Sequence, residues 1–401
     1  MKFGIFYEHQ LPRPWTDDAE HILLKNSLDQ IELADQLGFD YAWEVEHHFL
    51  EEYSHSSAPE VFLAAASQRT KNIRLGHGII QLTTNHPSRV AERVATLDLV
   101  SDGRVELGLG EGASITELHP FKRRFRDKRL IWEDAVRAML PMFWNESWEY
   151  DGEFFEFPAR NVITKPLQKP HPPLWVACSQ LETIVMAAHR GMGALGFAFV
   201  SPQAAEAWVN AYYNEFTKRM EKLCDYQTNP AIAVVAGFMC CPTDEEAQEK
   251  ADGWTFFQFA LKFYNKFGPT APGQVNLWEE YQQWKASPEG EEDTAEGLIG
   301  SPETVHRKML EFEATHVDQV ILLNQAGKNT HEDICSSLKL FAQEVMPEFH
   351  AREPEHQEWK RKVLNGEIQL EEIDTQPFEQ AGRQRPTKKP GTAPSLATGK
   401  W

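Results

Sequence analysis

The feature that most constrains the fold is the alternation of short apolar runs with longer segments of helical periodicity. Eight times along the chain, an apolar run typical of a buried strand precedes a segment whose apolar residues recur at helical spacing. Buried strands joined by helices indicate a parallel sheet. Eight such units predict a (β/α)8 barrel, the TIM barrel, with a doubly wound sheet as the alternative. The expected strands are residues 2–7, 41–45, 73–82, 105–109, 174–178, 194–200, 231–240 and 317–323.

Two insertions and a tail interrupt this pattern. A long segment after the fourth strand predicts a helix at 128–143 and a hairpin at 148–157. After the seventh strand, residues 244–263 predict a helix, and residues 266–300, rich in Gly, Pro, Glu and Trp, predict an irregular insertion. From residue 353 onward we expect an extended or partly disordered tail. The predicted domains are therefore a barrel over 1–350 and a polar extension over 351–401.

Composition limits the possible partners. The 401-residue chain has a formal net charge of −20, which disfavours binding to nucleic acid or to an anionic membrane. Its five cysteines form no CxxC pair, and the chain starts directly with a strand pattern. These features predict neither a disulfide framework nor a structural zinc site, and they favour the cytoplasm. No apolar run approaches the roughly 18 residues of a membrane span.

The stretch WEVEHHF, residues 43–49, places ionisable groups where the second strand ends. In a (β/α)8 barrel the C-terminal strand ends line the active site. If strand alternation continues, Glu46 and His48 share one face and His47 takes the other, so the two histidines do not easily converge on a metal. A catalytic or cofactor-contacting histidine is the leading interpretation. A structural hydrogen-bonding role and a metal site are the alternatives.

The stretch GLGEGA, residues 108–113, formally matches the dinucleotide fingerprint GxGxxA. It follows a fourth strand rather than a first, and no acidic strand end lies about 20 residues further on, as that fingerprint requires. Its glycines predict either a close backbone approach to a flat ligand or a tight turn.

Taken together, these motifs resemble the bacterial luciferase-like, flavin-dependent monooxygenases. The resemblance covers about residues 1–349 in order. It rests on several motifs: MKFGIF, GFDYAWEVEHHF, LTTNHPSRVAERVATLDLVSDGRVELGLG, PPLWVACS, GSPETV and LKLFAQEVMPEF. Within this set, WEVEHHF is especially similar to the luciferase α-subunit motif.

The resemblance implies a (β/α)8 barrel, usually dimeric, that uses reduced flavin mononucleotide (FMN) supplied by a separate reductase. The reduced FMN reacts with dioxygen, and a second substrate, here a small organic molecule, is oxidised. His47 takes the place of the catalytic histidine. A non-proline cis peptide bond is expected at Gly78-Ile79, under the flavin ring.

The remaining expected contacts also come from the resemblance. Gly78, Ile79, Gly110, Glu111, Gly112, Cys178 and Ser179 are the expected cofactor-binding residues, and Glu46, Ser114 and Glu117 the expected substrate-binding residues; no metal is expected. Gly110 replaces a reactive cysteine of luciferase, Glu111 an arginine that often meets the flavin phosphate, and Cys178 a glutamate. A carboxylate repels phosphate unless it turns away. The sequence therefore does not show which residues bind the flavin phosphate.

Two other functions remain compatible with the sequence. One is a deazaflavin-dependent dehydrogenase on the same barrel, which needs no oxygen. The other is a non-catalytic flavin-binding partner subunit, against which the presence of His47 argues. The expected state is a cytoplasmic homodimer that meets a flavin reductase transiently.

Overall fold

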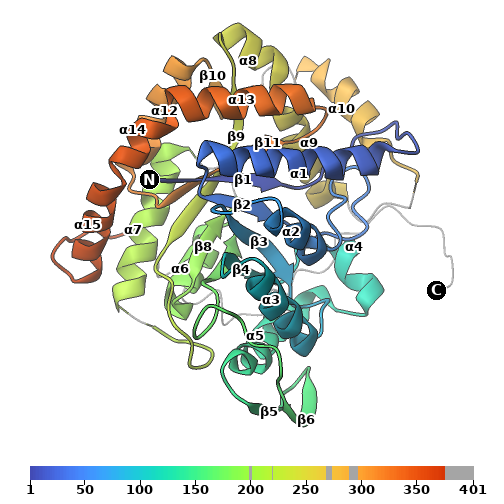
Figure 1. The fold of residues 1–401 in the computed structure, drawn as a ribbon. Coiled ribbons are helices and arrows are strands. Elements are labelled where there is room, and N and C mark those ends of the chain that lie inside the picture. The colour runs from blue at the N-terminus through green and yellow to red at the C-terminus, as the bar shows by residue number, and fades with distance from the viewer. Residues whose placement is uncertain (198–200, 219, 268–272, 289–296, 375–401) are drawn as a thin grey trace.

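The computed structural model describes residues 1–197, 201–218, 220–267, 273–288 and 297–374. Eight parallel strands form a closed barrel, and helices surround it (Figure 1). Going round the barrel, β11 is followed by β1, β2, β3, β4, β7 and β8, and β9 pairs with both β8 and β11. The strands are β1 (Lys2–Tyr7), β2 (Tyr41–Glu44), β3 (Arg74–Gln81), β4 (Val105–Gly110), β7 (Leu174–Cys178), β8 (Gly193–Gly196), β9 (Ile232–Cys240) and β11 (Gln319–Gln325). The predicted TIM barrel is confirmed.

The helices follow the strands in the expected alternation. Helix α1 ends where Gly38 adopts the left-handed conformation (φ 89°), which glycine adopts without the steric penalty of a side chain. The helices outside the insertions are α1 (Ala19–Leu37), α2 (Pro59–Ser67), α3 (Pro87–Val100), α6 (Leu181–Arg190), α7 (Pro202–Lys218), α8 (Asp244–Lys250), α9 (Asp252–Phe267), α12 (Pro302–Ala314), α13 (His331–Glu344), α14 (Met346–Ala351) and α15 (Glu353–Leu364).

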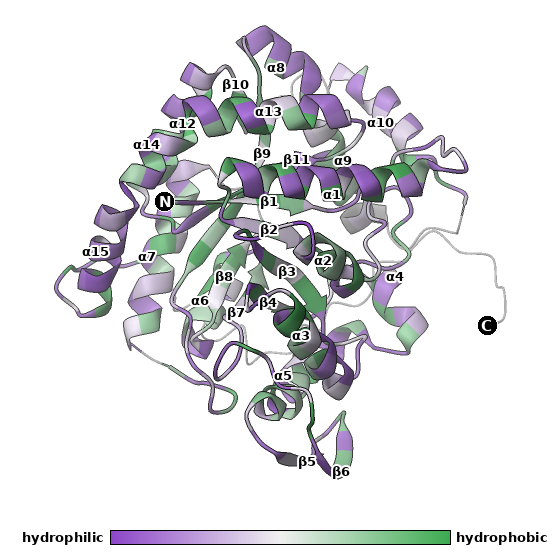
Figure 2. Cartoon of the chain, in the orientation of Figure 1, coloured by the Kyte–Doolittle hydropathy of each residue, from purple (hydrophilic) through white to green (hydrophobic). Residues whose placement is uncertain are grey.

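Two apolar layers follow from the two faces of each strand. In β1, Phe3 and Ile5 belong to the core between strands and helices, whereas Phe6 belongs to the core inside the barrel. This alternation is the period of two that a pleated strand imposes. Trp43 is fully buried inside the barrel, with the ring of Trp175 5.5 Å away at 82°. Figure 2 accordingly shows apolar strands within helices whose outer faces are largely polar.

The segment between β4 and β7 carries the first insertion. It contains the short helix α4 and a predicted hairpin that the structure places slightly later. Its elements are α4 (Ile115–Leu118), η1 (His119–Phe121), η2 (Phe125–Asp127), α5 (Lys128–Met139), η3 (Leu140–Phe143), β5 (Ser147–Asp151) and β6 (Glu156–Asn161). The helix predicted over 128–143 changes to 3-10 geometry at its end, where Pro141 lacks the amide proton that the α-helical pattern needs.

Two predictions of irregular structure are wrong. The segment 266–300 contains α10 (Leu277–Lys285), capped by Asn276, and β10 (Leu298–Gly300), which pairs with β9. The expected tail begins with α15, which contacts α7, with its Val363 buried. Residues 268–272 and 289–296 of the predicted insertion, 375–401 of the predicted tail and 198–200 of the predicted sixth strand lie outside the described part of the chain.

Candidate active site at the barrel mouth

His47 lies between two carboxylates that come from distant parts of the chain. Glu8 follows the end of β1, and its Oε1 is 3.0 Å from His47 Nε2. Glu117 belongs to α4, and its Oε1 is 2.8 Å from His47 Nδ1. Both carboxylates are almost completely buried, whereas the His47 side chain is 18% exposed. The C-terminal ends of barrel strands thus meet one insertion around a single imidazole, as expected for an active site of this fold.

The two carboxylates determine the protonation of His47. Burial alone would lower the pKa of His47, but the negative charges of Glu117 and Glu8 outweigh burial and raise this pKa well above its ordinary value. The effect on the partner is reciprocal. Burial alone would raise the pKa of Glu117, yet the His47 cation and several hydrogen bonds lower it below its ordinary value.

Glu117 is held in place by more than His47. Its Oε1 accepts hydrogen bonds from Gln81 Nε2 (2.6 Å) and from the backbone amide of His48 (3.2 Å). Ser114 caps α4 by accepting from the backbone amide of Thr116 (3.1 Å). Glu117 and Ser114, predicted to bind substrate, therefore lie beside the catalytic candidate, with Glu117 paired to it and Ser114 shaping the short helix.

Glu46 pairs with the second histidine of the motif. Its Oε1 is 3.0 Å from His48 Nε2 and accepts from Asn85 Nδ2 (2.8 Å), and its Oε2 accepts from the backbone amide of Gln81 (2.9 Å). The strand alternation predicted for residues 46–48 is wrong, because β2 ends at Glu44 and these residues are not in a strand. Glu46 and His48 nevertheless pair with each other, while His47 pairs with Glu8 and Glu117.

The glycine-rich segments of β3 and β4 pack against each other. The cis peptide bond expected at Gly78-Ile79 is present. A Cβ atom on Gly110 would lie 2.3 Å from Ile79 Cδ1, so the Ile79 side chain occupies the space that a residue with a side chain would need. Gly112 has a φ of 76°, a conformation that glycine tolerates best. Packing between strands is therefore one reason for these glycines.

Glu111 is neutralised by cations from α5. It forms an ion pair with the Arg129 guanidinium, and its Oε2 is 3.6 Å from Lys128 Nζ. The Arg129 charge also acts electrostatically on the Cys178 thiol, whose pKa it tends to lower. Glu111 was expected to repel a phosphate, but this pairing places an arginine beside the carboxylate.

Cys178 and Ser179 lie where β7 leads into α6. The Cys178 thiol is buried and contacts the carbonyl oxygens of Val176 (3.4 Å) and Thr183 (3.3 Å), and burial raises its pKa to about 12. It is therefore a protonated, unreactive thiol. Ser179 is exposed, and its backbone amide donates to Thr183 Oγ1 (3.2 Å) at the start of the helix.

The buried polar atoms without a hydrogen-bond partner within the described ranges include Glu8 Oε1, which meets His47 as an ion pair, and three others beside the site: Gln81 Oε1, Glu117 Oε2 and Asn324 Nδ2. Of these three, two accept hydrogen bonds and one donates. Buried polar atoms normally have partners, so these three indicate a place where a polar ligand or water binds.

Several of these residues had no predicted role. Glu8, Gln81 and Asn324 stand at or next to strand ends, a position that places them at the rim, but nothing in the sequence gave them partners. Arg129, on α5, carries no such signal, because its contact depends on how the insertion after β4 folds back.

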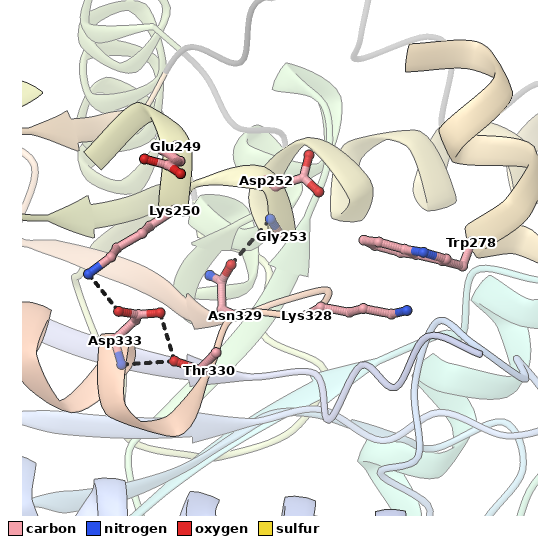
Figure 3. A pocket seen from close by; sticks show the side chains of 9 residues that line it. All are labelled: Glu249, Lys250, Asp252, Gly253, Trp278, Lys328, Asn329, Thr330 and Asp333. Carbon is pink, nitrogen blue, oxygen red and sulfur yellow. Dashed lines mark hydrogen bonds and ion pairs between the residues drawn. The ribbon is translucent and has the colours of Figure 1, made fainter. Parts of the chain in front are cut away.

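A separate cavity of about 360 Å³ lies between α8, α9, α10 and the loop before α13 (Figure 3). Its polar groups largely bind one another. Lys250 pairs with Asp333 (2.7 Å), and Asn329 accepts from the backbone amide of Gly253 (3.2 Å). Lys328 lies 4.2 Å from the centre of the Trp278 ring. These contacts connect the insertion after β9 to the barrel.

Among the described residues, no three His, Cys, Asp or Glu side chains are grouped so that they could hold a metal ion. No helix in the described ranges has the length and apolar character needed to cross a membrane.

Comparisons with known proteins agree on the family. Residues 1–319 match the model of the luciferase-like monooxygenase family. The chain is 26% identical, over 87% of its length and 96% of the relative, to the oxygenase component of the flavin-dependent trigonelline monooxygenase of Acinetobacter baylyi.

Two solved structures share the fold. The oxygenating constituent of 3,6-diketocamphane monooxygenase from Pseudomonas putida, in complex with FMN, has a TM-score of 0.69 and 20% identity, covering 86% of this chain and 98% of the other. Coenzyme F420-dependent tetrahydromethanopterin reductase from Methanopyrus kandleri has a TM-score of 0.63 and 21% identity, covering 87% of this chain and 99% of the other. The chain therefore belongs to the luciferase-like family of flavin-dependent monooxygenases.

Proposed function

We propose that this protein is the oxygenase of a two-component system, using reduced FMN and dioxygen to oxidise a small organic substrate. The observation that carries the proposal is His47, fixed between Glu8 and Glu117 at the mouth of the barrel. The relative from Acinetobacter is itself an oxygenase component, and the fold neighbour from Pseudomonas binds FMN. The reduced FMN would come from a separate reductase.

Two features of the mouth support a flavin as the ligand. Gly78, Ile79, Gly110 and Gly112 offer backbone and one apolar side chain to the flat ring. The unpaired Gln81 Oε1, Glu117 Oε2 and Asn324 Nδ2 match a ring edge that both donates and accepts hydrogen bonds. When bound, reduced FMN would supply the electrons that activate dioxygen.

The phosphate of FMN would lie near the start of α6. Ser179 is exposed there, and the amide groups of a helix N-terminus favour an anion. Arg129 would supply a cation near the phosphate, because it forms an ion pair with Glu111, the residue that stands where relatives often carry an arginine. Backbone atoms of Cys178 and Glu111 complete this proposed cradle.

His47 would hold a proton beside the reacting atoms. Tyr53, 7% exposed, packs its ring 5.5 Å from the imidazole and limits the access of water. Glu46 and Ser114 are proposed to contact the substrate at the rim. We further propose that the protein is a cytoplasmic homodimer. Size-exclusion chromatography with light scattering would measure the mass of the assembly.

The cofactor is tested by anaerobic titration with reduced FMN and, in parallel, with reduced F420. We expect saturable binding of FMN and, after oxygen is admitted, reoxidation of bound FMN at a rate that differs from that of free FMN. Binding of F420 alone would support the dehydrogenase alternative. A non-catalytic subunit would be supported if the protein binds FMN, bound FMN reoxidises at the rate of free FMN, and His47→Gln leaves that rate unchanged.

A further inference from the structure

We propose that Glu8 and Glu117 hold His47 as an imidazolium, so that His47 serves the bound cofactor and substrate as a proton donor and Glu117 is its positioning residue. This inference rests on the proposed function for its role in catalysis. The protonation state itself is a property of the protein alone and can be measured without a flavin.

The charges around the ring favour two N–H groups. A neutral imidazole has one N–H and one nitrogen lone pair. Here Nδ1 is hydrogen-bonded to Glu117 at 2.8 Å, and Nε2 lies 3.0 Å from Glu8 Oε1 in an ion-pair contact that falls outside hydrogen-bond geometry. A lone pair directed at a carboxylate oxygen is repelled, whereas an N–H is attracted. Both contacts are favourable only when the ring carries both protons.

Glu117 cannot easily turn away to relieve such repulsion. The same Oε1 that faces His47 accepts from Gln81 Nε2 and from the backbone amide of His48. Gln81 Nε2 is itself fixed, because it also donates to the carbonyl oxygen of Glu46 (2.8 Å). The carboxylate is thus locked in an orientation that keeps the Nδ1 proton in place.

The two nitrogens consequently have different tasks. Nδ1–H stays with Glu117, whose oxygen is held by three donors in total. Nε2–H faces Glu8 at the longer distance, and loss of this proton leaves a neutral ring that still donates to Glu117. The proton on Nε2 is therefore the one available for donation.

The remaining charged and titratable groups around His47 agree with this arrangement. Glu46 and His48, from its own segment, pair with each other. From the packed elements, Tyr53 stays neutral, because burial raises its pKa well above the ordinary value, and Tyr264 of α9 lies beyond it with its own pKa raised by burial. Two carboxylates thus face one imidazolium, and no other cation competes among the described neighbours.

The test is a pH titration of the protein, free of flavin, with ¹⁵N-labelled histidine followed by NMR. Comparison with His47→Gln assigns the signal of His47. We expect both ring nitrogens to be protonated at pH 7.5, where an ordinary histidine is neutral. Removing one facing charge by Glu117→Gln lowers the titration midpoint by about 1 to 3 pH units, and Glu117→Asp restores part of that shift.

Glu20→Gln is the matched control, because Glu20 pairs with a different histidine, His55, at 2.7 Å. It should leave the midpoint of His47 unchanged. If Glu117→Gln fails to fold, Glu8→Gln and the unaltered protein decide the question. The proposal is overturned if one ring nitrogen of His47 in the wild type is unprotonated at pH 7.5. It is also overturned if the titration midpoint of His47 does not change when Glu8 or Glu117 is replaced by Gln.

The pH profile of turnover adds the catalytic readout. A donor is needed in its protonated form, so turnover should fall on the alkaline side, and this fall should move to lower pH in Glu117→Gln. An alkaline limb that does not move contradicts the positioning role. Absence of reduced FMN binding would instead sink the proposed function, while the NMR result would still stand or fall by itself.

Discussion

At the scale of single residues, His47 couples stability to pH. Because its folded pKa is raised, its contribution to the free energy of unfolding is complete below the unfolded value of about 6.5 and is lost as pH rises through the folded pKa. Glu117 has a lowered pKa, so its contribution is present above about 4.5 and is lost as pH falls. The pair therefore stabilises the fold most between these two values.

His47→Gln should lower the free energy of unfolding most near pH 6.5, by roughly 3 kcal/mol, because two buried carboxylates lose their cation. The cost should shrink toward pH 4.5, where the orphaned carboxylates accept protons, and again as pH rises through the raised pKa of His47, where the wild type loses the contribution of His47. Urea unfolding at three pH values measures this. The control is His55→Gln, and a cost independent of pH would contradict the pairing.

Arg129→Met should weaken the binding of reduced FMN about tenfold, since it removes a cation from the proposed phosphate site and leaves Glu111 with a weaker partner, Lys128 at 3.6 Å. The double variant Arg129→Met with Glu111→Gln should regain part of the affinity. Arg126→Met, on an arginine that is 73% exposed, is the control. Equal dissociation constants for the variants at 126 and 129 would remove Arg129 from the site.

The pattern of single residues explains why the site was only partly predictable. His47 stands in a recognisable motif, and Glu8 at a strand end. Glu117 lies 70 residues after His47, in a helix of four residues, so neither spacing nor periodicity connects the two. Glu117 pairs with His47 only because the insertion after β4 folds back over the barrel mouth. That folding depends on long-range contacts, which a local sequence pattern does not show.

At the scale of elements, the barrel was predictable and the later helices less so. Strands such as β9 are continuous apolar runs, and their buried character is visible in the sequence. Half of the residues of α15 are charged, and Trp359, Val363 and Leu364 are its main apolar residues, so its sequence resembles a solvated tail. Helix α15 is stable because its few apolar residues pack against the barrel domain, where α15 contacts α7.

Trp359 should anchor α15. Its ring stacks on His316 with centroids 4.1 Å apart and meets Tyr213 edge-on at 5.6 Å. Trp359→Ala should lower the free energy of unfolding by about 2–3 kcal/mol, less than for a fully buried tryptophan because this one is half-buried. Urea unfolding checks the value, with the exposed Gln357→Ala as control. Equal stability of the two variants would mean that α15 contributes little to the fold.

The same helix also supplies charge to the barrel. Asp318 is buried just before β11, and it contacts His356 (2.9 Å) and Lys360 (2.9 Å) of α15. Burial alone would raise the pKa of Asp318, but the Lys360 cation and the hydrogen bond with His356 lower it well below its ordinary value. Helix α15, which the sequence predicted to be part of a tail, thus compensates the negative charge of Asp318 at the start of β11.

At the scale of the whole molecule, charge opposes the proposed cofactor. The formal net charge is −20, whereas FMN carries a phosphate anion. A field of this sign slows the approach of a like-charged ligand, and salt screens it, with a Debye length of about 10 Å at 0.1 M. Local cations such as Arg129 act only at contact distance. They therefore affect the dissociation rate of FMN more than its association rate.

The association rate of reduced FMN should therefore rise with salt, by about two- to fivefold between 0.02 and 0.3 M, as repulsion is screened. The dissociation rate should rise too, since the contact with Arg129 is also electrostatic. Anaerobic stopped-flow fluorescence measures both rates. Reduced riboflavin, which lacks the phosphate, is the matched control, and its association rate should hardly change. An FMN association rate that falls with salt would show that the cations near the mouth, including Lys128 and Arg129, attract the cofactor over a longer range than their pairing with Glu111 allows.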